Sequence, residues 1–97
     1  MSTVSVVARL QAKSGMEDQV RHECLALIAP SRREEGCINY DLYESMDDPT
    51  VFVFIENWLS REHVEKHLEM PHCQEFDRRT AGILIGSEEI TFLKRIS

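Results

Sequence analysis

The sequence lacks the features of most secreted and membrane-spanning chains. Its three cysteines are an odd number without a CxxC pair, which favours reduced thiols over a disulfide framework. No apolar run approaches the ~18 residues of a transmembrane helix. The opening MSTVSVVARL has neither a basic start nor a long apolar stretch, so it does not resemble a secretory signal. We therefore expect a cytoplasmic protein that does not enter a membrane.

Positive charge is also scarce. Eleven Lys and Arg stand against 17 Asp and Glu, which gives a net charge of −6. A protein that binds phosphates through charge needs the opposite balance, so we expect neither nucleic acid nor an anionic membrane surface as a partner. Hydrophobic residues make up 42% of the 97 residues, as in a globular protein. One domain spanning 1–97 is expected, with a thin core.

The hydrophobic periodicity predicts the element order β-α-β-β-α-β, with the second helix in two pieces. Strands are expected over residues 3–10, 37–44, 51–58 and 88–96. This order is that of a ferredoxin-like fold, an α+β fold with an antiparallel sheet.

Short signals mark the predicted helix ends. Ser14 and Glu17 have the spacing of a capping box for the first helix, and Pro30 must end or kink it. Ser60 is an N-cap candidate for the second helix, and Pro71 suits the first turn of its second piece.

The third predicted strand is apolar on both faces. One face carries Val51, Val53 and Ile55, and the other carries Phe52, Phe54, Glu56 and Trp58. In this topology both helices cover the same face, so the other face would be left in water. A homodimer packed sheet to sheet would cover it.

Three of the four histidines fall within ten residues. His63 and His67 have the i,i+4 spacing of a zinc chelate, and His72 is a possible third ligand. No Cys partner accompanies the pair, and we expect no metal. His67 lies on the apolar stripe with Val64 and should face inward, which makes it the first candidate for acid–base or substrate-orienting work, ahead of His72 and then His63.

Other polar and aromatic residues lie near this histidine cluster. Glu56 shares a strand face with Phe54 and Trp58, where a carboxyl group needs a structural partner or a raised pKa. Trp58 fits the core and a pocket wall equally well. Tyr40 should share one strand face with Ile38 and Leu42. It is expected to be half-buried, with a partner for its hydroxyl group.

Several familiar catalytic patterns are missing. The sequence has no glycine-rich phosphate loop, serine nucleophile elbow or Cys/His triad spacing. Cys37 and Cys73 therefore fit small buried hydrophobes better than nucleophiles. Residues 31–36, SRREEG, place a basic pair beside an acidic pair and fit a solvated helix end.

Several segments in order resemble the antibiotic biosynthesis monooxygenase (ABM) family, most closely its small quinol-monooxygenase-like members. They are EEGCINYDLYE, the Asp48-Pro49 turn, FIENW and HVEKHLEMPH, after the opening VVARLQAKSG. The resemblance covers nearly the whole chain. It implies a dimeric α/β-barrel built from two ferredoxin-like subunits, each with a pocket between its sheet and its helices.

The resemblance also implies a chemistry. Characterised members of that family oxygenate quinols or polyphenols with O₂, without metal, flavin or haem. A small aromatic substrate and O₂ are then the expected partners, and no cofactor is expected. The implied catalytic residues are His67 or His72 as base, with Glu56 orienting a histidine. The implied pocket residues are Trp58, Tyr40, Phe54 and His63.

Two alternatives stay open. One is a non-catalytic dimer that binds a small ligand. The other is an isomerase of a phosphorylated signalling-sugar derivative, in which His and Glu would move protons. Haem degradation is disfavoured, because the haem-degrading relatives use an Asn on the first strand and TVSVVARL has none.

Overall fold

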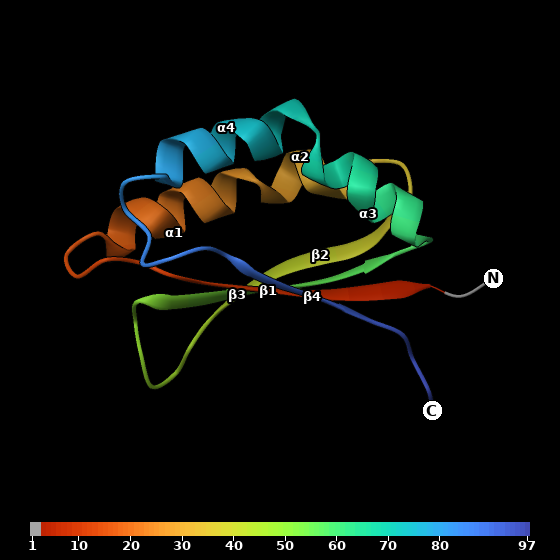
Figure 1. Cartoon of the computed structure of the whole chain (residues 1–97), viewed down its shortest axis with the longest axis horizontal. Coiled ribbons are helices and arrows are strands. Elements are labelled where there is room, and N and C mark those ends of the chain that lie inside the picture. Colours follow the sequence, from red (N-terminus) through yellow and green to blue (C-terminus); the bar gives the residue numbers. More distant parts are fainter. Residues whose placement is uncertain (1–2) are drawn as a thin grey trace.

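The computed structural model describes residues 3–97, which form one layer of helices on one face of a four-stranded sheet (Figure 1). Along the chain the elements are β1 (Val4–Gln11), α1 (Glu17–Ala26), α2 (Ile28–Arg32), β2 (Cys37–Glu44), β3 (Val51–Trp58), α3 (Arg61–Leu68), α4 (Pro71–Thr80) and β4 (Glu89–Leu93). The sheet order is β2-β3-β1-β4, and all neighbouring strands are antiparallel. This confirms the predicted ferredoxin-like fold. The sheet of the single chain is open rather than closed into a barrel.

Strand positions follow the predicted pattern closely. Both β2 and β3 begin and end at the predicted residues, whereas β4 is shorter than expected. On β1 the alternation is confirmed, since Val6, Ala8 and Leu10 are each at most 3% exposed. Among the described residues, no helix has both the length and the apolar character required to cross a bilayer.

The capping box predicted for the first helix is wrong. Met16 is the N-cap of α1 and its side chain makes no capping bond. The Glu17 carboxylate instead accepts a hydrogen bond from the backbone N–H of Gly15, at 2.7 Å. Gly15 has φ +87°, which turns the chain before the helix begins and leaves Ser14 outside it.

The break predicted at Pro30 is confirmed. A turn at Leu27 separates α1 from α2, three residues before Pro30. Proline has no N–H to donate to the carbonyl of Ala26, so the helical ladder cannot continue unbroken through this point. The short α2 is therefore a separate helix, and it packs against β2.

One face assignment on β2 is wrong. Ile38 was expected on the same face as Tyr40 and Leu42, but it is 52% exposed. The pairing of β2 with β3 shifts between Cys37 and Asn39, so Ile38 is an extra residue in a β-bulge. The bulge lets Cys37 pack against the core while Ile38 faces outward.

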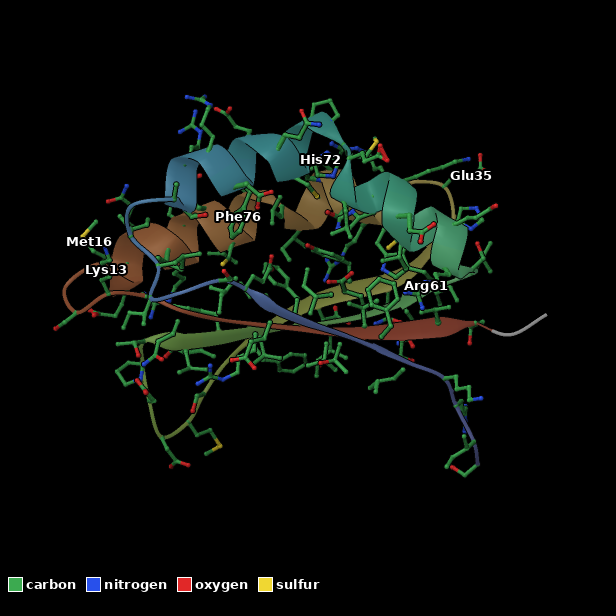
Figure 2. All side chains as sticks on the ribbon, in the orientation of Figure 1. Lys13, Met16, Glu35, Arg61, His72 and Phe76 are labelled. Carbon is green, nitrogen blue, oxygen red and sulfur yellow. The ribbon has the colours of Figure 1, made fainter. Side chains whose placement is uncertain are left out.

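The core lies between the sheet and the helices. Phe52, Phe54 and Trp58 of β3 are at most 1% exposed, so the predicted inner face of this strand is confirmed. From the helix layer, Phe76 of α4 points toward the sheet (Figure 2). α1 packs beside α4 and completes the cover.

The opposite face of the sheet is not covered by the chain (Figure 1). Tyr43 is 53% and Ile55 is 39% exposed there, and Val53 is only half-buried. Val51, which was expected on the same face, is already buried within the chain. An apolar surface of this kind is unusual for a monomer.

We expect this face to form a homodimer. Light scattering at micromolar concentration should give about twice the chain mass of 11.2 kDa. Ile55→Glu should shift the protein toward monomer, because the interface would bury two carboxylates without partners. Gln74→Glu adds the same charge on the exposed side of α4 and should leave the mass unchanged. A wild-type protein that stays monomeric would contradict this assembly.

Candidate functional site

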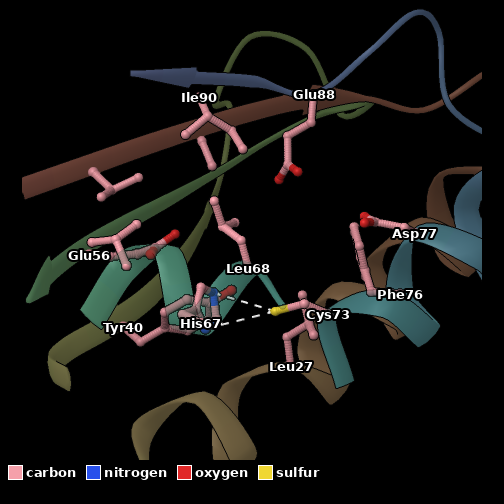
Figure 3. Close-up of a pocket in the computed structure, with 13 residues that line it drawn as sticks. Leu27, Tyr40, Glu56, His67, Leu68, Cys73, Phe76, Asp77, Glu88 and Ile90 are labelled. Atoms are coloured by element: carbon pink, nitrogen blue, oxygen red, sulfur yellow. Dashed lines mark hydrogen bonds between the residues drawn. The ribbon is translucent and has the colours of Figure 1, made fainter. Parts of the chain in front are cut away.

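A cavity of about 260 Å³ lies between the covered face of the sheet and the helices (Figure 3). Its lining residues are Val6, Ala8, Leu27, Tyr40, Glu56, Val64, His67, Leu68, Cys73, Phe76, Asp77, Glu88 and Ile90. A cavity of ~150 Å³ already holds benzene, so this volume suits one substituted aromatic ring. The wall is mostly apolar, with a few polar groups that converge on the space, as in ligand-binding pockets generally.

His67 is held in one orientation by Glu34. The imidazole Nδ1 lies 2.6 Å from Glu34 Oε2, and the whole residue is 3% exposed. A carboxylate can only accept, so Nδ1 carries the proton and Nε2 keeps its lone pair. The ring packs against Trp58, with centroids 4.7 Å apart, and its Nε2 lies 3.5 Å from the Cys73 sulfur.

Burial also keeps the His67 ring neutral. It lowers the pKa of His67, and the hydrogen bond and charge of Glu34 oppose this shift only in part. At neutral pH the cavity therefore contains a neutral imidazole in a fixed tautomer. Such a group can accept a proton from a ligand.

His72 binds the same carboxylate from the other side. Its Nε2 lies 2.7 Å from Glu34 Oε2, the oxygen that also accepts from His67. The Glu34 side chain is 7% exposed and that of His72 is 20% exposed. His72 does not line the cavity. It borders an outer groove with His22 and Arg79 instead.

The prediction that SRREEG is a solvated helix end is wrong for Glu34. After α2 ends at Arg32, Gly36 with φ +87° turns the chain back toward β2. The turn places the Glu34 carboxylate against His67 of α3 and His72 of α4. The Glu35 side chain points outward (Figure 2). The sequence contains no signal that distinguishes the two glutamates, because the difference comes from a tertiary contact.

Glu56 carries the raised pKa that its strand face predicts. It is 4% exposed, and its Oε1 accepts a hydrogen bond from Trp58 Nε1 at 2.8 Å. Burial is the main cause that raises its pKa to about 7, although the bond from Trp58 acts in the opposite direction. The structural partner of this carboxyl group is thus Trp58 rather than an Arg. Glu56 lines the cavity together with His67, but the carboxylate that accepts from His67 Nδ1 is that of Glu34. Glu56 is therefore not the residue that orients this histidine.

The aromatic residues divide into two shells. Tyr40 lines the cavity, and burial raises the pKa of its hydroxyl group, which therefore stays protonated. Phe54 and Trp58 do not line the cavity. They pack behind Tyr40, with ring centroids 5.2 and 6.4 Å from it, and hold it in place.

His63 lies away from the cavity, contrary to its expected place in the pocket. Its Nδ1 is 2.7 Å from the Ser60 hydroxyl, and Ser60 also caps α3 by accepting from the His63 N–H, as predicted. The His63 ring lies against Gly36, where an added Cβ would collide with it. His63 borders a surface depression with Lys66.

Two further carboxyl groups at the cavity were not predicted. Glu88 points into the space from the loop before β4, and Asp77 of α4 points toward it (Figure 3). Burial, helped by the charge of Asp77, raises the pKa of Glu88 to about 7. Burial also raises the pKa of Asp77. Among the lining residues of the described chain there is no Lys or Arg.

The structure groups His67, His72 and Cys73, whose nearest ligand atoms lie within 4.8 Å of one another. This set differs from the possible chelate of His63, His67 and His72 that the sequence spacing allows. In this group His67 Nδ1 and His72 Nε2 are both bonded to Glu34. Burial raises the pKa of the Cys73 thiol to about 12, so it keeps its proton. In the described structure these side chains form a cluster held together by hydrogen bonds.

The cysteines do not have the properties of nucleophiles. Burial raises the pKa of Cys37 to about 11, and that of Cys73 also lies far above neutral. A reactive cysteine needs the opposite shift. This agrees with the prediction that neither is a nucleophile. Cys73 is buried as expected, whereas Cys37 is only half-buried.

A family model, curated relatives and a solved structure all indicate the same protein family. The family model described as "Antibiotic biosynthesis monooxygenase" matches residues 3–79. The chain is 33% identical over 92 residues to "Putative monooxygenase Rv0793" of Mycobacterium tuberculosis, covering 95% of this chain and 90% of that protein. The solved structure of Rv0793 superposes with a TM-score of 0.92 and 31% identity, covering 99% of this chain and 97% of the other.

Two other relatives extend this comparison. "Probable quinol monooxygenase YgiN" of Escherichia coli is 30% identical over 90 residues, covering 81% of this chain and 86% of that protein. The Synechocystis protein sll1783 is 29% identical over 91 residues, covering 94% of this chain. The chain spans only 62% of the length of sll1783.

The raised pKa of Glu56 predicts a pH-dependent cost in stability. Its pKa is raised from 4.5 in the unfolded chain to about 7 in the folded protein. The stability that this group contributes is therefore fully present below pH 4.5 and is lost as pH rises through 7. Glu56→Gln keeps an acceptor for Trp58 but cannot ionise. Urea unfolding should show it more stable than wild type by on the order of 2–3 kcal/mol above pH 7, with little difference at pH 4. Glu62→Gln, an exposed change on α3, should show no such divergence.

Proposed function

Because the chain belongs to the antibiotic biosynthesis monooxygenase family, we propose that it is a cofactor-independent monooxygenase that oxidises an aromatic quinol or polyphenol with O₂. The observation that carries this proposal is the neutral His67, held by Glu34 at the wall of a buried cavity of single-ring size. The printed name of the E. coli relative supports a quinol as the substrate class.

The proposed reaction begins with a proton transfer. His67 Nε2 takes a proton from a phenolic hydroxyl group, and Glu34 stabilises the resulting imidazolium. The phenolate gives one electron to O₂, which leaves a semiquinone radical and superoxide. The two radicals combine at a ring carbon, and His67 returns its proton to the peroxide. Loss of water then leaves a carbonyl group, so no electrons are needed from outside.

The cavity suits this chemistry for physical reasons. Apolar residues such as Val6 and Phe76 exclude water, which protects the radical pair from side reactions. Tyr40 and protonated Glu56 can donate hydrogen bonds that orient a second hydroxyl group of the substrate. The chain's part is to remove a proton, fix the pose and keep the site dry.

The isomerase alternative fits the cavity poorly. A phosphorylated sugar needs cationic groups, and the lining residues of the described chain include no Lys or Arg. Asp77 and Glu88 in their ionised forms would repel a phosphate instead. A small-ligand-binding dimer without activity is the outcome that a negative oxygen assay would support.

We expect O₂ uptake with a panel of aromatic quinols, in buffer with a chelator and without added cofactor. His67→Ala should lower kcat by roughly 10²-fold, the usual size of a general-base contribution. His63→Ala, on the same helix but away from the cavity, should have little effect. Both rates are measured with an oxygen electrode against the uncatalysed blank.

The controls make this test decisive. The dimer mass should be nearly unchanged in both variants. His67→Ala should lower the melting temperature, because buried Glu34 loses one of its two donors, so the rates are compared at a temperature at which both variants are folded. Full activity in His67→Ala would remove this residue from the mechanism and leave Glu56, Tyr40 or the substrate's own ionisation as the source of the anion. No uptake above the blank for any quinol would contradict the oxygenase.

The carboxyl groups that line the cavity, Glu56, Asp77 and Glu88, predict that it binds neutral substrates better than anionic ones. A hydroquinone that carries a carboxylate should bind at least tenfold more weakly than its methyl analogue, because burying an anion beside Glu88 is costly. Glu88→Gln should reduce this difference, and Glu62→Gln should not. Quenching of the fluorescence of Trp58, the chain's one tryptophan, measures the affinities directly. Equal binding of both ligands would contradict the electrostatic argument.

A further inference from the structure

We propose that His72 is a positioning residue, which sets the basicity of His67 through the carboxylate they share and does not touch the substrate. The inference rests on the proposed role of His67 as the base. It assigns to His72 a task different from the catalytic one expected from the sequence.

The geometry of Glu34 carries this inference. His67 Nδ1 and His72 Nε2 lie 2.6 and 2.7 Å from the same atom, Glu34 Oε2. The two imidazoles come from α3 and α4 and have ring centroids 6.0 Å apart. Each contact requires one proton between nitrogen and oxygen, so both nitrogens donate to a single acceptor.

His72 has no route of its own to the substrate. It does not line the cavity, whereas His67 does. Glu34 stands between the two rings, with a side chain that is 7% exposed. The hydrogen-bonded path from His72 to the base therefore runs through this carboxylate.

Two donors on one oxygen weaken each other. The charge that Glu34 offers to His67 is partly taken up by the bond from His72. If the second donor is removed, Glu34 becomes a stronger acceptor for His67 and stabilises its imidazolium form. His72 therefore helps burial to keep the base neutral and ready at neutral pH.

Other titratable groups also lie near the two rings and could influence the pKa of His67. His67 also faces Tyr40 of β2, Cys73 of α4 and Glu56 in the cavity wall. On its outer side, His72 shares a groove with His22, Glu23, Glu75 and Arg79. None of these groups is changed by a substitution at His72.

The test measures the titration of His67 by NMR of ¹⁵N-labelled imidazoles in substrate-free protein. His72→Phe keeps an aromatic ring and removes the donor, and His72→Asn is too short to reach Glu34. Both should raise the pKa of His67 by roughly half a unit to one unit. His72→Gln places an amide donor near the position of Nε2 and should restore the wild-type titration. His22→Phe, in the same groove, should have no effect.

The pH–rate profile gives a second readout. In His72→Phe the acid limb of kcat should move to higher pH by the same amount, while KM stays nearly unchanged. An unchanged or lowered pKa of His67 in both donor-free variants would overturn the inference, and so would a His72→Gln variant that behaves like them. The NMR arm needs no turnover, so a failure of the oxygenase proposal leaves it intact.

Discussion

The candidate site depends on one buried carboxylate. Glu34 lies beneath α3 and α4 with 7% of its side chain exposed, where an unpaired charge would cost several kcal/mol. Two hydrogen bonds offset that cost, and bonds to a charged group contribute about 1.5–3 kcal/mol each. The bond to His67 Nδ1 also fixes which nitrogen of His67 carries the proton. Orientation, tautomer and burial of the base thus follow from a single contact.

The carboxyl groups of the site differ in their surroundings and therefore in the roles they can take. Glu34 accepts hydrogen bonds from two imidazole rings. Glu56 has one donor, Trp58, and burial raises its pKa to about 7. Glu88 faces Asp77, and its pKa also rises to about 7. Near neutral pH the cavity therefore contains a base and proton-holding carboxyl groups side by side.

Residues whose structure depends on neighbours in the sequence could be predicted. The bounds of β3, the caps at Ser60 and Pro71, and the inward direction of His67 all follow from local periodicity or turn chemistry. Features that depend on distant contacts could not be predicted. The burial of Glu34 needs α3 and α4 above it, and the exclusion of His63 from the cavity needs Gly36 beneath its ring. The bulge at β2 also has no signal in a strand of regular alternation.

The hydrogen bonds of the site join residues that are far apart in the sequence, so the site is intact only while the α3–α4 pair stays packed on the sheet. Glu34 meets His67 and His72 across 33 and 38 residues, and both imidazoles come from the α3–α4 pair. If this pair lifts from the sheet, the carboxylate loses both donors at once and becomes hydrated. Sub-global openings of this kind occur in proteins at free energies below that of complete unfolding. The base, its orientation and the dry cavity therefore appear and disappear together, as one cooperative unit within the fold.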